Sequence, residues 1–246
     1  MAILISGDRG RRGRTYTLIT PANRYASRIP DLPGAEFFKL VTPRLVPARF
    51  GEYLITGIGS AMTADIAPGL EHFFLGLGGG GAVRAGAERF DLADGGFAYA
   101  GPSQFVRLEL EPGASIVWIK RPWEPFKALA EPAPRGGRLT EVARAATATP
   151  GLYRRELLDP ADPACDFNVS HLEFDPDAAL AQIEIHDEEH GLLMTAGSGL
   201  YHLDGEELEV RAEDFIYMAP YCPQGFAAGR SGASYLLYKD VYRDGF

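Results

Sequence analysis

The sequence predicts an all-β protein made of two antiparallel β-barrels, and the main observation behind this prediction is an internal repeat. The pair Glu71-His72 recurs 118 positions later as Glu189-His190. The other matches at this spacing are Gly81 with Gly199, Phe97 with Phe215, Tyr99 with Tyr217 and Pro102 with Pro220. A repeat of this kind indicates that one structural unit occurs twice in the chain.

The second observation is that both copies consist of short alternating runs. After a one-residue insertion, residues 113–120 align with residues 232–239. Runs such as 97–100 and 215–218 alternate in the manner of strands, and Gly, Pro and Asp stand at the turn positions between them. This pattern favours antiparallel strands joined by hairpins.

The predicted organisation is an N-terminal barrel over residues 1–120, a Pro-rich linker over 121–160 and a C-terminal barrel over 161–246. The linker holds six prolines and a Gly-Gly pair, which keep most of it extended. Within it, residues 139–145 could form one short helix. In the N-terminal barrel, residues 16–19 and 37–41 are expected to be added strands.

Composition limits the classes of partner. The net charge of −9 argues against nucleic acid or an anionic membrane, since both require a basic surface. No apolar run approaches the roughly 18 residues of a membrane-spanning helix. We expect a cytoplasmic protein whose ligand is a small molecule. The two cysteines, Cys165 and Cys222, are too few for a disulfide scaffold or a thiolate zinc site, and Cys222 is expected to line a pocket at most.

The candidate metal ligands are concentrated in residues 182–191. On a strand the side-chain period is two, so Glu184 and His186 share one face, while Ile183 and Ile185 should pack on the other. A turn can then return His190 to the side of His186. A carboxylate with two imidazoles suits Mn²⁺, Fe²⁺ or Zn²⁺.

A fourth ligand is expected on a later strand, where Gln224 follows a Pro-x-x-Pro turn. The alternative is that this acidic segment is only a solvated hairpin. Against it, the first copy has Ile66 and Pro68 where the second has Glu184 and His186, so only one copy of the scaffold has the cluster. The remaining histidines, which have no partner at ligand spacing and are expected to be structural or exposed, are His72, His171 and His202.

Tyr235 and Lys239 are four positions apart on one predicted strand and should share a face. A lysine inside a barrel loses its proton more readily there, which would suit an acid/base residue. The alternative is a strand-end lysine that reaches solvent, and Lys120 in the first copy supports that reading.

These residues resemble the cupin superfamily, in which a strand-borne pair, a following His and a late ligand bind a metal. Glu184 in the first place and Gln224 in the last argue against ordinary oxalate decarboxylases and most cupin dioxygenases. The pattern resembles that of the (S)-ureidoglycine aminohydrolase family. The matching stretches are residues 167–169, 189–194, 218–224 and 235–241.

The resemblance implies a bicupin, with two double-stranded β-helix (jelly-roll) domains of which the first is metal-free. It also implies Mn²⁺ bound by Glu184, His186, His190 and Gln224, and a ureide substrate contacted by Glu184, Gln224, Tyr235 and Lys239, with Tyr235 and Lys239 as the catalytic residues. The family releases ammonia from (S)-ureidoglycine in allantoin and purine breakdown and forms homo-oligomers. The alternatives are a cupin dioxygenase and a cupin that only binds a small molecule.

Overall fold

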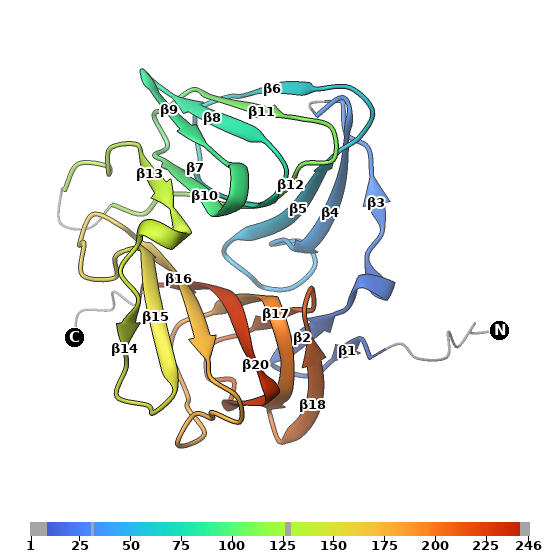
Figure 1. Cartoon of the computed structure of the whole chain (residues 1–246). Helices are drawn as coiled ribbons and strands as arrows, with labels where there is room; N and C mark the ends of the chain where they lie inside the picture. Colours follow the sequence, from blue (N-terminus) through green and yellow to red (C-terminus); the bar gives the residue numbers. More distant parts are fainter. Residues whose placement is uncertain (1–8, 31, 126–128, 242–246) are drawn as a thin grey trace. The chain divides into compact units, whose positions relative to one another are not determined.

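The computed structural model describes residues 9–30, 32–125 and 129–241, and nearly all of its regular structure is β-strand (Figure 1). The strands pair antiparallel throughout the described pairings. Within the described ranges, the helical pieces are single 3-10 turns: η1 (Pro21–Asn23), η2 (Ala93–Gly95) and η3 (Leu139–Glu141). The all-β prediction is therefore confirmed.

The largest sheet has nine strands, in the order β1-β2-β19-β17-β20-β16-β15-β14, with β18 paired to β17. Its strands are β1 (Arg11–Arg12), β2 (Tyr16–Ile19), β14 (Ala145–Ala146), β15 (Leu152–Leu158), β16 (Phe167–Phe174), β17 (His190–Leu203), β18 (Glu206–Arg211), β19 (Phe215–Met218) and β20 (Gln224–Asp240). β17 and β20 are long and bend, and their pairing contains two register shifts.

The first copy of the repeat forms two sheets, one of seven strands in the order β13-β10-β7-β12-β5-β4-β3 and one of four in the order β6-β11-β8-β9. The strands are β3 (Ala26–Ser27), β4 (Ala35–Val41), β5 (Gly51–Gly57), β6 (Met62–Ile66), β7 (Glu71–Gly78), β8 (Gly81–Ala85), β9 (Glu88–Asp91), β10 (Gly96–Ala100), β11 (Val106–Leu110), β12 (Ser115–Arg121) and β13 (Arg135–Arg138).

The chain divides into two compact units, each containing one copy of the repeat. The N-terminal unit consists of residues 25–143 and 157–166. The C-terminal unit consists of the described residues of 1–24, 144–156 and 167–246. Its pieces come from three separate stretches of chain, so the predicted boundaries at 120 and 160 do not coincide with the division.

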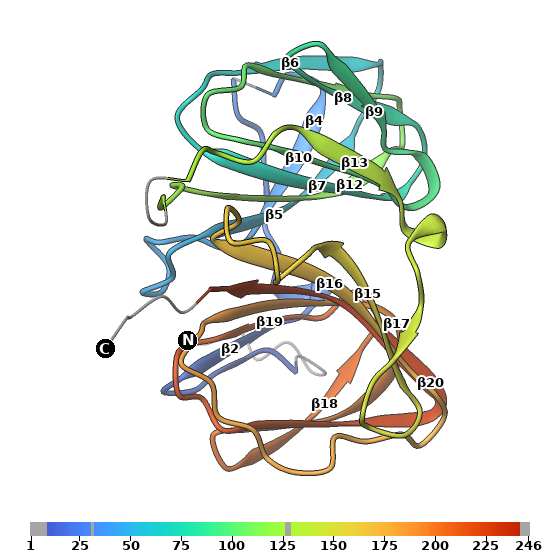
Figure 2. The same ribbon diagram turned by 90° about the vertical axis from the view of Figure 1, so that its left-hand side faces the viewer.

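The start of the described chain belongs to the C-terminal unit, whereas the sequence placed it in the N-terminal barrel. β2 pairs antiparallel with β19, with Tyr16 opposite Met218 (Figure 2). Arg9 adds an ion pair to the buried Asp214, with nitrogen-to-oxygen distances of 2.5 and 3.0 Å. The physical reason is burial: Tyr16 and Leu18 are each 2% exposed and complete the core of the C-terminal unit.

Residues 121–160, which were predicted to be a linker, instead contribute strands to the sheets. β13 extends the seven-stranded sheet by pairing with β10, and β14 pairs with β15. The helix expected over residues 139–145 is only the 3-10 turn η3, followed by β14. A single turn is too short to recover the cost of helix nucleation, whereas strand pairing satisfies the backbone on each side of it.

Each unit has its own apolar core, built from the inward faces of its strands. In the N-terminal unit, Tyr53, Phe74 and Trp118 are at the centre. In the C-terminal unit the corresponding cluster includes Leu172 and Tyr235. Alternate residues face inward, as the period of two requires. The same alternation brings the polar residues of the candidate site to the inward side.

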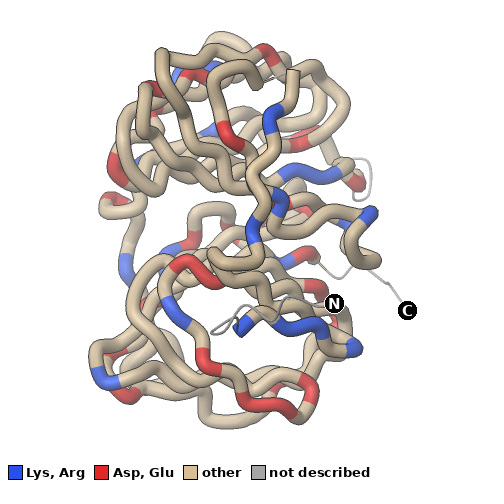
Figure 3. The backbone as a smooth tube through the Cα atoms, turned by 90° about the vertical axis from the view of Figure 1, so that its right-hand side faces the viewer, with Lys and Arg blue, Asp and Glu red and all other residues tan. Residues whose placement is uncertain are grey.

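Figure 3 shows acidic and basic residues interspersed along the described backbone. Within that part of the chain, no helix combines the length and the apolar character needed to cross a membrane. Nucleic acid and membrane remain partners that the sequence argues against.

Candidate metal centre

The segment from Gln182 to Glu189 approaches the start of β20 and brings two candidate ligands together. Glu184 and Gln224 exchange two backbone hydrogen bonds, of 2.7 and 2.9 Å. The Tyr221 amide also donates to the His186 carbonyl at 2.7 Å, which ties the Pro-x-x-Pro turn to the same segment. Gln224 is 5% exposed and lies on the same side of β20 as the core residue Phe226. Gln224, the candidate ligand on the later strand, therefore lies beside Glu184.

The alternation predicted for this segment is correct, but its apolar side is not packed. Ile183 and Ile185 are 48% and 62% exposed, while Glu184 and His186 are half-buried. The segment forms only an isolated bridge and not a named strand. Because it lies at the margin of the sheet, its outward side meets solvent. The expectation that the two isoleucines pack was therefore wrong.

The two histidines converge on the same region. The His186 and His190 ring centroids are 5.1 Å apart, and His186 Nε2 lies 3.1 Å from Glu184 Oε2. His190 is 4% exposed, and burial first, then the nearby Lys239 and His186, hold its pKa well below the usual range. Its ring hydrogen-bonds to the Glu188 backbone. The ring of neutral imidazole then keeps its second nitrogen available to a cation.

The donor set fits a divalent ion of intermediate hardness. It offers a carboxylate, two imidazoles and a carboxamide, which are ligands that Mn²⁺ accepts. Within the residues that the structure describes, no group of three or more His, Cys, Asp and Glu side chains is already arranged to hold a metal ion. Glu184 and His186 instead bond to each other. The four residues are near one another, and the ligand set itself remains a prediction.

Lys239 and Tyr235 both lie on β20, with Leu237 between them. Lys239 stands opposite His190 in the strand register, and Tyr235 opposite Met194. The Lys239 amine is not at a free strand end, because its Nζ lies 3.4 Å from Glu188 Oε2 and its side chain is 23% exposed. The geometry favours a lysine directed at the candidate site over one that only reaches solvent.

Two residues near the site were not identified from the sequence. Glu188 forms the ion pair with Lys239, and its inward position could have been predicted by continuing the alternation of Glu184 and His186. Tyr201 is buried and shares a side-chain hydrogen bond with Tyr235. Burial is the main cause of the raised pKa of both tyrosines, and the Glu184 carboxylate adds to it. Tyr201 gave no signal beyond an ordinary strand pattern.

The remaining histidines and cysteines are not candidate ligands, although Cys222 shares the core cluster of Tyr201 and Tyr235. His72 is buried and accepts a 3.2 Å hydrogen bond from Trp118 Nε1, and His171 is buried beside Thr195, at 3.0 Å. These two are structural, as expected. Cys165 and Cys222 are both buried thiols. Burial raises the pKa of Cys165 to about 12, which makes it a poor nucleophile.

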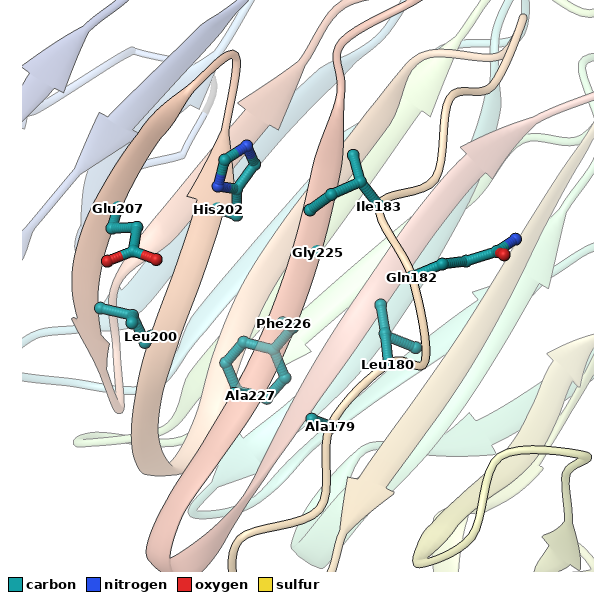
Figure 4. A pocket seen from close by; sticks show the side chains of 10 residues that line it. All are labelled: Ala179, Leu180, Gln182, Ile183, Leu200, His202, Glu207, Gly225, Phe226 and Ala227. Atoms are coloured by element: carbon teal, nitrogen blue, oxygen red, sulfur yellow. The ribbon is translucent and has the colours of Figure 1, made fainter.

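A shallow groove of about 290 Å³ lies on the outward side of the C-terminal unit (Figure 4). His202, Leu200 and Glu207 line one side of it and Ile183 the other. Leu200 and His202 flank the core residue Tyr201 on β17, so their side chains face away from the core. The groove is therefore separate from the candidate metal centre, and His202 belongs to this outer surface.

Comparison with known proteins gives two informative relatives. The chain is 32% identical to the (S)-ureidoglycine aminohydrolase of Escherichia coli (strain K12) over 93% of this chain and 89% of the relative. It is 30% identical to the (S)-ureidoglycine aminohydrolase of Arabidopsis thaliana over 94% of this chain and 77% of that one. No protein-family model matches the chain.

Solved structures give the same picture of the fold. The crystal structure of protein Ylba from E. coli superposes with a TM-score of 0.86 at 26% identity, over 98% of this chain and 97% of that one. Oxalate decarboxylase from Bacillus subtilis, described as containing Mn(II) centres, superposes with a TM-score of 0.68 over 96% of this chain and 80% of that one. At 12% identity the second likeness concerns the fold alone.

Proposed function

Because the chain belongs to the (S)-ureidoglycine aminohydrolase family, we propose that it hydrolyses (S)-ureidoglycine to (S)-ureidoglycolate and ammonia in purine and allantoin breakdown. The observation that carries the proposal is the placement of Lys239 opposite His190, whose ring lies beside that of His186. The fold proposed with it is a bicupin, in which the C-terminal unit holds the active site. A cytoplasmic location and a homo-oligomeric assembly remain predictions.

The proposed metal is Mn²⁺, held by Glu184, His186, His190 and Gln224. When bound, it would supply a Lewis acid that orients the substrate and stabilises developing negative charge. Three features of the chain support this: the mixed oxygen and nitrogen donor set, the lowered pKa of His190, and the backbone bridge that holds Glu184 beside Gln224.

The reaction replaces a carbon–nitrogen bond of the substrate by a carbon–oxygen bond. Water must lose a proton, and the departing amine must gain one before it leaves as ammonia. Lys239 is placed to move this proton, because its amine lies on the inward side beside His190 and is held there by Glu188. Tyr235, buried and hydrogen-bonded to Tyr201, has a fixed hydroxyl that can orient the polar end of the substrate.

The test generates the unstable substrate in place by coupling the protein to allantoate hydrolysis. Ammonia release and the chirality of the product are measured with and without the protein and Mn²⁺. We expect selective consumption of the (S) form and formation of (S)-ureidoglycolate. Racemic product at a protein-independent rate would contradict the proposed function. Oxygen uptake is recorded in parallel, since consumption of oxygen would indicate the dioxygenase alternative.

A further inference from the structure

Strand β15 directs a second set of charged side chains into the C-terminal unit. Leu152 belongs to the buried core together with Leu172 and Tyr235. Because side chains alternate along a strand, Arg154 and Glu156 lie on the same inward side as Leu152. Arg155 lies on the opposite side, where its Nε donates to Glu173 at 2.8 Å. Two consecutive arginines therefore face in opposite directions.

The inward arginine is held in place but has capacity left for a ligand. Its Nη1 lies 3.4 Å from Glu156 Oε1, and the other oxygen of Glu156 accepts a hydrogen bond from Ser170 Oγ. The Nε of Arg154 is buried and has no hydrogen-bond partner among the residues that the structure describes. The side chain is nevertheless 42% exposed, so a small molecule can reach the guanidinium.

Arg154 is also near the proposed substrate-binding residue Tyr235. Burial raises the pKa of Tyr235, and the positive charge of Arg154 opposes this increase. The same tyrosine is influenced by the carboxylate of Glu184. The strand register supports this proximity, because Ser170, which bonds to Glu156, stands opposite Leu237, the residue between Tyr235 and Lys239 on the inward side of β20.

The substrate of the proposed function carries a carboxylate, which requires a positive partner inside the unit. Lys239 is already paired with Glu188, and the Glu184 carboxylate would repel an anion. A guanidinium offers a planar pair of donors that matches the two oxygens of a carboxylate. We propose that Arg154, oriented by Glu156 and Ser170, binds the substrate carboxylate and selects acids over their uncharged amides. This inference rests on the proposed function.

The test measures binding as well as turnover. The probe is N-carbamoylglycine, which is the substrate without its amine and cannot react, and N-carbamoylglycinamide is its uncharged counterpart. Titration calorimetry on the full-length protein compares wild type with Arg154→Met and with Arg155→Met, the matched control on the outward side. A charge-assisted hydrogen bond of about 1.5–3 kcal/mol predicts that Arg154→Met raises the Kd of the acid about 10- to 100-fold.

Binding of the amide should be weak and the same in all three proteins. Arg155→Met should bind the acid as wild type does, and the KM for ureidoglycine should follow the Kd of the acid. Arg154→Lys keeps a cation and covers the case in which the methionine variant does not fold; it should bind the acid with intermediate affinity.

Equal affinity of wild type and Arg154→Met for the acid would overturn this inference, whatever the activity. If wild type prefers the acid through Arg154 but releases no ammonia from ureidoglycine, the carboxylate subsite is supported and the proposed function is wrong. The two failures are therefore distinguishable.

Discussion

The two copies of the repeat differ most in what fills their interiors. In the N-terminal unit Trp118 stands opposite Tyr53 in the register of β12 and β5. In the C-terminal unit the equivalent pair, on β20 and β16, is Leu237 opposite Ser170. Two large aromatic rings are thus replaced by an aliphatic side chain and a hydroxyl. The N-terminal unit uses this volume for packing, and the C-terminal unit leaves it to polar groups.

The equivalent histidines show the same division. In the N-terminal unit Trp118 Nε1 donates to His72 Nδ1, so one ring nitrogen is already used within the core. Its equivalent, His190, bonds to the Glu188 backbone and lies beside His186. A histidine kept in both copies is a packing residue in one and a candidate ligand in the other, because its neighbours differ.

The equivalent lysines of the two units also differ in their contacts. Lys120 lies over the rings of Trp118 and Tyr53, with Nζ-to-centroid distances of 4.5 and 5.1 Å, whereas Lys239 pairs with Glu188. A small number of inward side chains therefore distinguishes the unit that packs an aromatic core from the unit that holds the candidate site. Substitutions in matched pairs test this directly.

The largest effect is expected from His186→Ala. Removing one imidazole from a four-ligand set should abolish tight metal binding, and activity should fall to background. Elemental analysis of the purified variant checks the metal content, which we expect to be about one ion per chain in wild type. His72→Ala is the control and should leave the metal content unchanged. Two tightly bound ions per wild-type chain would contradict the one-site interpretation.

The next effect concerns the lysine pair. Lys239→Met removes the amine while keeping most of the side-chain volume, and kcat should fall about 10²- to 10⁴-fold if the amine transfers a proton. Metal content should stay that of wild type, which separates loss of the amine from loss of the ion. Lys120→Met, at the equivalent position of the N-terminal unit, should leave kcat unchanged. Normal turnover by Lys239→Met would remove the lysine from the mechanism.

A third test gives the C-terminal unit a core residue of the N-terminal unit. Leu237→Trp places in the C-terminal unit the residue found at position 118. Overpacking should lower stability by about 1–3 kcal/mol. Because the added ring would lie between Tyr235 and Lys239 and displace them, kcat/KM should also fall, by about 10- to 100-fold. The reciprocal Trp118→Leu should lower the free energy of unfolding by about 2–4 kcal/mol through the cavity it leaves. It should not gain metal, because Ile66 and Pro68 provide no ligands. Unchanged kinetics in Leu237→Trp would show that this volume is not used by the site.

The smallest expected effect is on the pH dependence of stability. Glu52 is 1% exposed and stands where the C-terminal unit has the buried Val169. Burial raises the pKa of Glu52 to about 8. Because this folded value exceeds that of the unfolded chain, its contribution to stability is present at low pH and is lost as pH rises through about 8.

Glu52→Gln should therefore be more stable than wild type above that pH, by about 1–3 kcal/mol, with a difference that shrinks toward pH 5. Denaturant unfolding at several pH values measures it. A difference independent of pH would mean that the Glu52 carboxyl does not titrate in this range.

Much of the fold could be predicted because the internal repeat indicates two similar structural units. The offset from Glu71 to Glu189 identifies two like units before any strand is assigned. The pairing of β2 with β19 could not be predicted, since the short apolar run Tyr16–Ile19 does not say which of two similar sheets it joins. Only the burial of Tyr16 and Leu18 in the C-terminal core distinguishes them.

The candidate site was predictable where residues are close in sequence, as for Glu184 and His186. Gln224 was proposed from its place after the Pro-x-x-Pro turn, and the family resemblance supported the choice, because an amide after a turn has no distinctive spacing of its own. Arg154 was missed because it lies in the segment taken as a linker. Its alternation with Leu152 and Glu156 is visible in the sequence, but two neighbouring arginines in a linker look like surface charge.

The three-piece composition of the C-terminal unit has a consequence for how the protein is made. During synthesis β2 leaves the ribosome long before its partner β19, and β20, which carries Gln224, Tyr235 and Lys239, emerges after β19. The N-terminal unit can collapse early around its local hairpins, whereas the C-terminal unit must wait for contacts distant in sequence. Gln224 would then join Glu184, His186 and His190 only once β20 has been translated, and the side of β2 that pairs with β19 would have to wait until β19 emerges.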